Sequence, residues 1–426
     1  MKNSIPTPRR RFIQGAALAG ALSLSPGSIW AANKASNHLR VGVIGLSRGV
    51  AHVRRFAETS GVEVAYVCDV DEKRIARGTK ALKAGDAKGV VDFRRILEDP
   101  EVDVLSIAAP NFWHAPAAIL AMEAGKHVYV EKPGSHNMAE ADMIVAASRK
   151  YDRRVQMGNQ RRSYPHVREA MQRLREGVIG KVHTARTWYN NRRTSIGKGK
   201  PAKPPEGLNY ELWEGPTPHK PYVDNLVHYN WHWRWHWGGG EMANNGVHSI
   251  DVARWGLGVD LPERVTYNGG RYYFDDDQET PDTGEATFHF GDCLISWSGS
   301  SCDPRRDEDL PFCKFYGEKG SLTTNGGNDY RILDRDGKEL ENKSGPGGEP
   351  DHFKNFVEAV RDKGIELNSE IGDAQNSAKL CHLANIAYRT TGSLSCDPKE
   401  GGKLIGNSAG KKLWGRKYRK GWKPKV

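Results

Sequence analysis

The sequence predicts an α/β protein with two folded parts. The first is a Rossmann domain with a doubly wound parallel sheet, and the second is an α/β domain with a large open, mainly antiparallel sheet. In the first part, short apolar stretches alternate with stretches of helical periodicity, which is typical of buried parallel strands joined by helices. In the second part, polar and apolar residues alternate and the stretches break at glycines, as antiparallel strands do. The length of 426 residues suits two or three domains.

The strand-like stretches of the first part are each followed by a turn and then by a helix-like stretch. We expect strands at 39–45, 63–71, 102–110, 127–133 and 154–158, and helices at 50–59, 72–83, 114–125 and 139–150. This alternation predicts a Rossmann domain over residues 36–157.

The second part, residues 158–395, combines strand-like stretches with two helix-like ones. We expect strands within 181–191, 264–274, 284–300, 311–327 and 330–340, and helices at 351–364 and 374–392. A second domain on one large sheet follows from this pattern.

The two ends of the chain differ from its body in charge. Residues 1–35 hold five basic residues and no acid, and residues 401–426 hold nine and no acid, so the body carries −3 of the net +11. A nucleic-acid-binding protein carries its basic surplus on the folded domain, so this class is disfavoured. We interpret residues 396–426 as a basic, solvated tail; contact with an anionic surface is the alternative.

The N-terminus has the pattern of an export signal. The segment "PRRRFIQ" (8–14) precedes a short run of small apolar residues, which is followed by small residues of the kind found at a signal-peptide cleavage site. Its arginine pair followed by Phe12 resembles a twin-arginine (Tat) signal. We expect residues 1–35 to be removed and the protein to be exported, for example to the periplasm; a buried N-terminal helix is the alternative. No later run approaches the roughly 18 apolar residues that span a bilayer, so no integral membrane segment is expected after removal of the signal.

The turn "GLSRG" (45–49) stands where a dinucleotide-binding domain has its phosphate loop. Gly45 permits the tight turn, and the amides of Ser47 to Gly49 can face a pyrophosphate at the helix N-terminus. Asp69, 24 residues after Gly45, can accept from both ribose hydroxyls and repel a 2′-phosphate. This favours NAD over NADP, although Arg74 would partly offset the repulsion; an ordinary βα loop is the alternative. The expected cofactor ligands of this region are Gly45, Ser47, Arg48, Gly49, Asp69 and Arg74.

Three further motifs accompany this turn: "AAPNFWHAP" (108–116), "EKP" (131–133) and "GGGEMANNGVHSIDVARWGLG" (238–258). Together the four motifs resemble the Gfo/Idh/MocA oxidoreductases, and over residues 38–390 the chain looks most like exported bacterial members. The resemblance implies an NAD(P)-dependent oxidoreductase that acts on CH–OH groups of a small carbohydrate. It also implies a homodimer or homotetramer that forms through the outer face of the large sheet.

The resemblance places the chemistry on four residues. Lys132 of "EKP" would lie beside the nicotinamide, where a cation stabilises developing alkoxide charge. The pattern D-x-x-x-H-x-x-D of inositol dehydrogenases falls on Asn244, His248 and Asp251, which makes His248 the expected general base. Asp251 would orient His248 or hold a substrate hydroxyl. Asn244 replaces the family's acid, so His248 would be less basic; a surface lysine and a buried core histidine are the alternatives.

The stretch "YNWHWRWHW" (229–237) directly precedes these residues. Its alternation predicts an extended segment with four tryptophans on one side and His232, Arg234 and His236 on the other. The rings can stack on sugar faces, or they can pack the sheet against the first domain; both interpretations stand. Histidines four residues apart suit a helix better than an extended chain, so no metal site is expected. The glycines of 238–240 would let the backbone approach the nicotinamide closely.

The remaining candidates lie at strand ends and at the domain junction. Capping of the next helix is the alternative for Asn111, and linker roles are the alternative for Gln160 and Arg161. Pro110, Asn111, His114, Glu131, Lys132 and Gln160 are expected to line the cofactor crevice, and Arg161, Trp235, His236 and Asn245 are expected to bind substrate.

Three functions are compatible with these residues. The first is an exported NAD-dependent oxidoreductase that acts on a hydroxyl of a sugar, polyol or glycoside by hydride transfer to or from nicotinamide C4. The second is a glycoside hydrolase that uses a tightly bound NAD for transient oxidation and elimination. The third is a non-catalytic sugar-binding protein, for which Asn244 is the main support.

Overall fold

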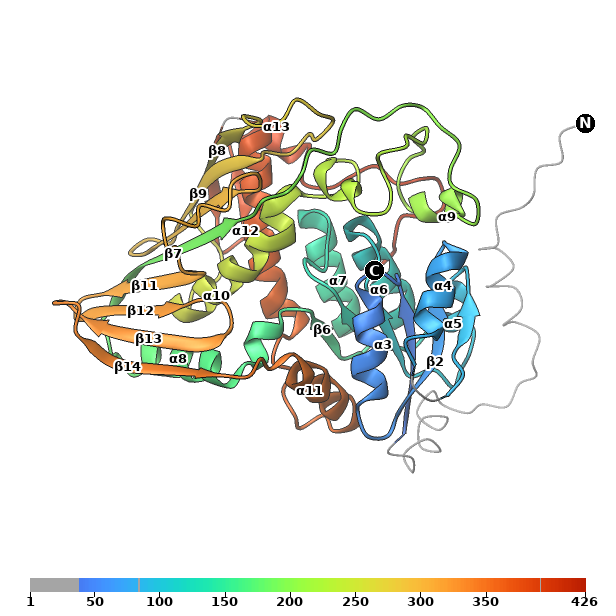
Figure 1. Ribbon diagram of the computed structural model, residues 1–426, viewed down its shortest axis with the longest axis horizontal. Coiled ribbons are helices and arrows are strands. Elements are labelled where there is room, and N and C mark those ends of the chain that lie inside the picture. Colours follow the sequence, from blue (N-terminus) through green and yellow to red (C-terminus); the bar gives the residue numbers. More distant parts are fainter. Residues whose placement is uncertain (1–37, 83–84, 391) are drawn as a thin grey trace, which may run out of the picture.

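The computed structural model describes residues 38–82, 85–390 and 392–426. The expected export signal lies outside the described residues. Two domains lie side by side, each built on one sheet (Figure 1). The first sheet is parallel and the second is mostly antiparallel, so the predicted fold class is confirmed.

The first domain contains a six-stranded parallel sheet with helices on both faces. Its strands are β1 (Leu39–Ile44), β2 (Val62–Cys68), β3 (Lys88–Val90), β4 (Val104–Ile107), β5 (His127–Val130) and β6 (Val155–Met157). Its helices are α3 (Gly49–Ala57), α4 (Glu72–Thr79), α5 (Arg94–Leu97), α6 (Asn111–Glu123) and α7 (Met138–Lys150). Every residue of β4 and β5 is buried, as expected for central strands covered on two sides. The short elements β3 and α5 were not predicted, because three or four residues carry no periodicity.

The strand order of this sheet is β3-β2-β1-β4-β5-β6. The order reverses between β1 and β4, so the loops that follow these two strands lie next to each other. Ligands of open α/β sheets bind at the carboxyl ends of the strands at such a switch point. The topology therefore fixes where a cofactor site can form.

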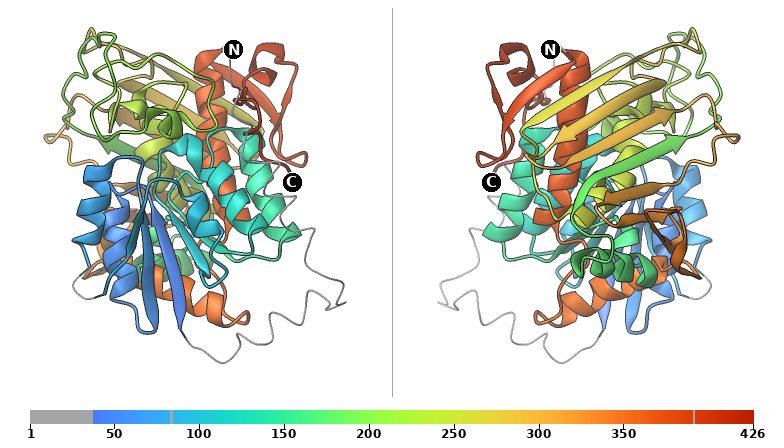
Figure 2. Two further views of the ribbon diagram at one scale, coloured as in Figure 1. Left: turned by 90° about the vertical axis from the view of Figure 1, so that its right-hand side faces the viewer. Right: turned by 90° about the vertical axis from the view of Figure 1, so that its left-hand side faces the viewer.

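The second domain contains a ten-stranded sheet in the order β14-β13-β12-β11-β7-β10-β9-β8-β15-β16, in which only β7 and β10 pair in parallel. Its strands are β7 (Val182–Asn190), β8 (Arg264–Gly270), β9 (Thr283–His289), β10 (Leu294–Ser300), β11 (Cys313–Gly317), β12 (Gly320–Thr324), β13 (Asn328–Asp334), β14 (Glu339–Gly345), β15 (Ser393–Asp397) and β16 (Lys403–Ile405). Alternate residues point inward, as Val265, Phe288 and Trp297 do. Figure 2 shows that helices cover one face of this sheet and leave the other face open.

The helices and short turns that follow β6 complete the fold. They are η2 (Gln160–Ser163), α8 (Pro165–Arg175), α9 (Tyr210–Glu214), η3 (Asn230–Trp233), η4 (Met242–Gly246), α10 (Val247–Leu257), α11 (Glu349–Arg361), α12 (Ile371–Arg389) and α13 (Ser408–Lys411). Although α11 comes late in the chain, its Phe353 and Phe356 pack into the core of the first domain. The rings of Tyr129 and Phe353 are stacked with centroids 4.5 Å apart.

The long helix α12 joins the two domains. It lies against α7 of the first domain and β8 of the second (Figure 1). Gln375 of α12 donates to the carbonyl oxygen of Pro133 at 3.1 Å and accepts from the Ser135 hydroxyl at 2.7 Å. A helix of the second domain therefore holds the backbone directly after β5.

The expectation of a solvated C-terminal tail is wrong. Strands β15 and β16 extend the large sheet, and the chain then returns to the first domain. Arg416 donates to the buried carboxylate of Glu140 at 2.7 Å, and the Tyr418 hydroxyl donates to the same oxygen at 2.6 Å. The basic charge of this segment had suggested exposure, but buried acids neutralise part of it.

Within the described part of the chain, no helix is long and apolar enough to cross a membrane. The same residues include no group of three or more histidine, cysteine or acidic side chains placed to hold a metal ion.

Candidate functional site

A cavity of about 350 Å³ opens at the carboxyl ends of the parallel strands. Its walls come from the loops after β1, β2, β3, β4 and β5, from segment 228–232, and from the start of α10. Most of the sequence-predicted cofactor residues lie in these walls. They are Gly45, Ser47, Arg48, Asp69, Arg74, Pro110, Asn111, His114, Glu131, Lys132 and Gln160.

The turn after β1 is built around Gly45. Its φ is +82°, and a Cβ atom there would lie 2.5 Å from the backbone of Ala108 after β4. The missing side chain thus lets the two switch-point loops touch. Ser47 and Arg48 are exposed at the mouth of this turn.

Gly49 has a different role from the predicted one. Its amide donates to the carbonyl oxygen of Gly45 at 3.1 Å and does not face the cavity. A Cβ atom at Gly49 would lie 3.2 Å from Val43 of β1. This glycine therefore serves the close packing of α3 against the sheet.

Asp69 is held in place at the end of β2. One carboxylate oxygen accepts from the Leu46 amide at 2.7 Å and the other from the Asp71 amide at 3.1 Å. Since each oxygen has a further lone pair, both can still accept from the two hydroxyls of a ribose. Burial raises the pKa of Asp69, while the Leu46 amide and Arg74 oppose this rise.

Asn111 and His114 lie on α6, directly after β4. The helix begins without a side-chain cap, so Asn111 is not the cap that the alternative interpretation required. Nε2 of His114 donates to the carbonyl oxygen of Ala109 at 2.8 Å. Burial lowers the pKa of His114 to about 4, so this imidazole is neutral at pH 7.

Glu131 connects several residues around the part of the cavity that contains Lys132. Its carboxylate accepts from Arg48 at 3.1 Å, from Gln160 at 3.3 Å and from the Lys132 amide at 3.2 Å, and it lies 3.1 Å from Nε2 of His52. Burial alone would raise the pKa of Glu131, but His52, Arg48 and Lys132 hold it well below its usual range. A fixed anion at the end of β5 thus ties α3 to the domain junction.

The side chain of Lys132 contacts Asn244, not Glu131. Its Nζ donates to the main-chain oxygen of Asn244 at 2.5 Å and to Oδ1 of the same residue at 2.9 Å. Asn244 lies in the π-helical turn Met242–Gly246, a geometry that recurs at functional sites. Burial lowers the pKa of Lys132, against the opposing effects of Glu131 and Glu241.

His248 lies in the wall of the same cavity as Lys132 and Asn244. Burial lowers its pKa well below the usual value, and the charges of Arg161 and Lys132 lower it further. No hydrogen bond to either ring nitrogen is found among the described residues. The predicted convergence of Lys132 and His248 on one cavity is therefore present, while their catalytic roles stay predictions.

Asp251 does not orient His248, and this part of the prediction is wrong. Its two oxygens accept from Arg162 at 2.9 and 2.7 Å, and one of them also accepts from the Ser377 hydroxyl at 2.7 Å. The side chain of Asp251 is 1% exposed, so it cannot reach a substrate. It secures α10 to η2 and α12.

The predicted substrate ligands lie elsewhere. The guanidinium of Arg161 stacks on the ring of Phe312 at 4.3 Å, and Asn245 donates to Glu241 at 2.7 Å. Trp235 and His236 line a second cavity of about 500 Å³ and not the one that contains Lys132. None of the four lines the first cavity.

The aromatic stretch is not extended, because Asn230–Trp233 forms a short 3₁₀ helix. Trp231 and Trp237 are buried in the core of the first domain, so packing between the domains explains two of the four tryptophans. Gly238 lies against the backbone of His232, since a Cβ atom added there would be 2.3 Å from the carbonyl oxygen of His232, and it does not line the first cavity.

The 3₁₀ turn brings His232 into the cavity wall, which the sequence analysis missed. Its ring stacks on Trp231 at 3.6 Å, and its Nδ1 lies 2.6 Å from the carbonyl oxygen of Tyr229, to which it can only donate. Nε2 is then the unprotonated nitrogen. Burial lowers the pKa of His232 to about 3. His228 also lines the cavity and lies 2.9 Å from Asp71.

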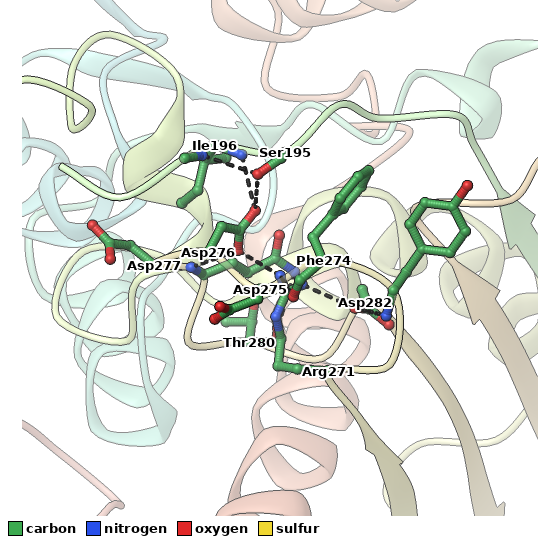
Figure 3. A network of polar contacts seen from close by, with 12 residues as sticks. Ser195, Ile196, Arg271, Phe274, Asp275, Asp276, Asp277, Thr280 and Asp282 are labelled. Atoms are coloured by element: carbon green, nitrogen blue, oxygen red, sulfur yellow. Dashed lines mark hydrogen bonds and ion pairs between the residues drawn. The ribbon is translucent and has the colours of Figure 1, made fainter.

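An acidic loop between β8 and β9 contacts Ser195 and Ile196 (Figure 3). Through Asp277 it also contacts Arg234 of the histidine-bearing segment. One oxygen of Asp277 accepts from Arg234 at 3.0 Å and from the Gly199 amide at 2.8 Å. Asp276 accepts from the hydroxyl of Ser195 at 2.8 Å and from the Ile196 amide at 2.9 Å. Burial would raise the pKa of both carboxyls, but these donors hold them below the usual value.

A glycine turn and a buried acid at the switch point, with a lysine and neutral imidazoles in the same cavity, are the features of nicotinamide-dependent oxidoreductases. Two family models match the chain. An oxidoreductase-family model with an NAD-binding Rossmann fold matches residues 39–159, and the model of the C-terminal α/β domain of that family matches residues 178–424. The chain belongs to the Gfo/Idh/MocA oxidoreductase family, and its first domain binds NAD.

Several relatives share part of this sequence. Myo-inositol 2-dehydrogenase of Thermotoga maritima is 27% identical over 226 residues, which cover 53% of this chain and 57% of that protein. Glycosyl hydrolase family 109 protein 1 of Shewanella sp. (strain ANA-3) is 30% identical over 152 residues, which cover 34% of this chain and 33% of that protein. The chain thus spans between one third and about three fifths of these two relatives.

Solved structures resemble the whole fold. Aldose-aldose oxidoreductase from Caulobacter crescentus, 20% identical, covers 84% of this chain and 99% of its own with a TM-score of 0.66. Levoglucosan dehydrogenase in complex with NADH and levoglucosan, also 20% identical, covers 81% of this chain and 95% of its own with a TM-score of 0.63. At this identity the likeness concerns the fold.

Proposed function

We propose that the protein is an NAD-dependent oxidoreductase that acts on a hydroxyl group of a sugar, polyol or glycoside. The observation that carries the proposal is the contact of Lys132 with two neutral oxygens of Asn244 in the wall of the cofactor cavity, which His248 also lines. A buried lysine without a carboxylate acceptor releases its proton more readily than a lysine in water does, which suits a proton acceptor in the reaction. Bound NAD supplies the hydride acceptor or donor, at nicotinamide C4.

The residues that would hold NAD are those of the switch point. The turn at Gly45 and Ser47 would face the pyrophosphate, and Asp69 would accept from the adenosine ribose. The carboxylate of Asp69 disfavours a 2′-phosphate, so NAD is preferred over NADP. Arg74 lies in the same wall and weakens this preference.

Lys132 is the proposed proton acceptor. In the direction of oxidation it would take the proton of the substrate hydroxyl, and both oxygens of Asn244 would then hold the resulting ammonium. This ammonium would stabilise alkoxide character on the substrate. His248 is the weaker base, because its pKa is far below 7.

His248 and His232 would orient the substrate. Both imidazoles are neutral at pH 7, and each offers an unprotonated nitrogen as a hydrogen-bond acceptor. Neutral acceptors that surround one lysine suit a molecule with several hydroxyl groups better than they suit an anion. A sugar, polyol or glycoside has this chemistry.

A second candidate function is glycoside hydrolysis through a transient oxidation with bound NAD. The similarity to a glycosyl hydrolase family 109 protein favours it. The same lysine would serve, since the ring hydroxyl is first oxidised and later restored. The third candidate, a non-catalytic sugar-binding protein, loses its main support because Asn244 has a direct role as the partner of Lys132.

One experiment separates these functions. The purified protein is denatured and its supernatant is examined for nicotinamide absorbance; the native protein is then assayed with free sugars and with p-nitrophenyl glycosides. Net formation of NADH with a free sugar supports the oxidoreductase. Release of p-nitrophenol without net NADH supports the hydrolase, and no turnover with any substrate while a sugar raises the melting temperature supports the binding protein.

We also propose that the protein is exported by the Tat pathway and assembles as a homo-oligomer. The arginine pair at Arg9 and Arg10 supports export, and the uncovered face of the large sheet supports assembly (Figure 2). Replacement of both arginines by lysine should keep the protein in the cytoplasm. Light scattering of the processed protein gives the oligomeric state, and a monomer would contradict the assembly.

A further inference from the structure

The C-terminal segment, residues 413–426, reaches the cofactor cavity. Trp422 lines this cavity together with Phe93 and Trp113. The rings of Trp113 and Trp422 meet edge to face with centroids 5.4 Å apart, and Phe93 meets Trp113 in the same way at 5.5 Å. Three aromatic side chains from distant parts of the chain thus form one wall.

This aromatic wall belongs to the adenine half of the cavity. In a Rossmann domain the acid at the end of the second strand holds the adenosine ribose, and here that acid is Asp69. Phe93 follows the edge strand β3, on the side of β2 that faces away from β5 and Lys132. The nearby wall residues Val70 and Val91 are apolar, as a site for a flat base requires.

Buried carboxylates anchor the segment. Glu140, which is fully buried, accepts from Arg416 at 2.7 Å and from Tyr418 at 2.6 Å. Glu214, whose side chain is 1% exposed, accepts from Arg419 at 3.2 Å. A buried carboxylate that loses its cation is costly, so these pairs hold the segment in its observed place.

We propose that residues 413–426 are a built-in part of the NAD site: Trp422 covers the adenine, and NAD leaves only when this segment detaches. Base–aromatic contact stabilises the bound cofactor, and the anchors at Glu140 and Glu214 make detachment slow. The inference rests on the cofactor part of the proposed function and not on the choice of substrate, so it holds for the oxidoreductase and for the hydrolase.

Segment docking and cofactor binding must then be coupled in both directions. If the docked segment favours NAD, bound NAD favours the docked segment by the same factor. A cofactor retained in this way would stay on the protein between turnovers. Such retention suits an enzyme that works where free NAD is scarce.

The first test measures release of NADH from the full-length protein. The protein is loaded with NADH, freed of excess ligand, and mixed with a large excess of NAD while the fluorescence of bound NADH is followed. Trp422→Ala should release NADH about 10- to 100-fold faster than the unchanged protein, which corresponds to the usual contribution of one stacking contact. Trp422→Phe should restore most of the slow release, and Lys399→Ala, at an exposed position outside the segment, should leave the rate unchanged.

The outcomes separate a cofactor contact from a packing role. A folded Trp422→Ala protein with a lower melting temperature but an unchanged release rate would overturn the proposal. Equal acceleration by Lys399→Ala would also overturn it, since the effect would not depend on the aromatic ring. If Trp422→Ala does not fold, Trp422→Leu keeps an apolar contact with Trp113 and tests the same loss of stacking.

The second test uses the exposed lysines of the segment as reporters. Trypsin cleavage after Lys417 or Lys420 releases peptides that contain Trp422, and mass spectrometry follows their appearance. Saturating NAD should slow this cleavage about tenfold in the unchanged protein and have little effect in Trp422→Ala. Equal cleavage with and without NAD would show that the segment is not coupled to the cofactor.

Discussion

Replacement of Asn244 by aspartate changes one atom in the contact that carries the proposed mechanism. Oδ1 of Asn244 lies 2.9 Å from Nζ of Lys132, and it is neutral. A carboxylate at the same place would interact with the ammonium by about 6 kcal/mol at an effective dielectric constant of about 20. Part of this gain is offset by desolvation, and opposite charges at such distances typically shift a pKa by about 1 to 3 units.

The direction of the effect on rate follows from this shift. Burial keeps the pKa of Lys132 below its usual value in the unchanged protein, so its neutral form is populated at lower pH than that of a lysine in water. Asn244→Asp stabilises the ammonium, so the neutral form becomes populated only at higher pH. We expect the ascending limb of kcat/KM for sugar oxidation to move up by about 1 to 3 pH units, with a loss of about 10- to 1,000-fold at a fixed pH below both limbs.

The assay is the pH profile of kcat/KM with NAD saturating. Asn244→Ser is the matched control, because it shortens the side chain without adding charge and should lower the rate without moving the limb upward. An unmoved limb in Asn244→Asp, or a faster reaction near neutral pH, would refute the role of Lys132 as proton acceptor. The second result would instead favour a permanently charged lysine.

The remaining predictions concern turnover, cofactor choice and stability. Lys132→Ala should lower kcat by at least about 100-fold, the usual contribution of a positioned base, while the Kd for NAD by calorimetry stays within about threefold; unchanged turnover would remove Lys132 from the mechanism. Asp69→Ala should weaken the binding of NAD and reduce the preference for NAD over NADP by about tenfold, because the charge that repels the 2′-phosphate is lost. Equally poor binding of NADP to the variant would contradict the proposed contact between Asp69 and the ribose. The melting temperature should fall as the pH decreases from about 6.5 toward 4, since the unfolded chain takes up protons there while the buried histidines do not, at up to about 1.4 kcal/mol per histidine and pH unit; a melting temperature that is flat over this range would contradict it. The histidines concerned are His114 and His352, with pKa lowered to about 4, and His127, His232 and His382, with pKa lowered to about 3.

The sequence alone was sufficient to predict the structural features that depend on residues close together in the chain. The strand, glycine turn and helix around Gly45 lie within about twenty residues, and Asp69 follows at the end of the next strand. Each of these positions is set by local geometry and by the parallel topology. Lys132 was placed correctly for the same reason, because the ends of parallel strands meet at one edge of the sheet.

Long-range polar contacts could not be predicted in this way. Asp251 was expected near His248, three residues away, but its partner Arg162 lies 89 positions earlier in the chain. An ion pair inside the protein depends on the approach of two elements that no local pattern specifies. Once Arg162 occupies both oxygens of Asp251, the carboxylate has no reason to face the cavity.

Two other errors came from patterns with more than one physical cause. Alternating tryptophans suggested an extended segment. The same sequence can also form a 3₁₀ turn when the rings are buried between two domains, as the ring of Trp231 is. The basic C-terminus suggested solvation, because the charge of a single sequence does not reveal that the buried carboxylates of Glu140 and Glu214 accept from Arg416 and Arg419. In both cases tertiary packing decided the outcome.

The hydrogen bonds between α12 and the segment after β5 have a consequence for the separation of the two domains. Gln375 and the Ser135 hydroxyl fix the loop that carries Lys132, so the nucleotide-binding half is not a self-sufficient module. A fragment ending at residue 157 would lose the partner that positions Lys132, and it would also lose Phe353 and Phe356 from its own core. Grafting this half onto another substrate domain would therefore require that domain to bring an equivalent helix.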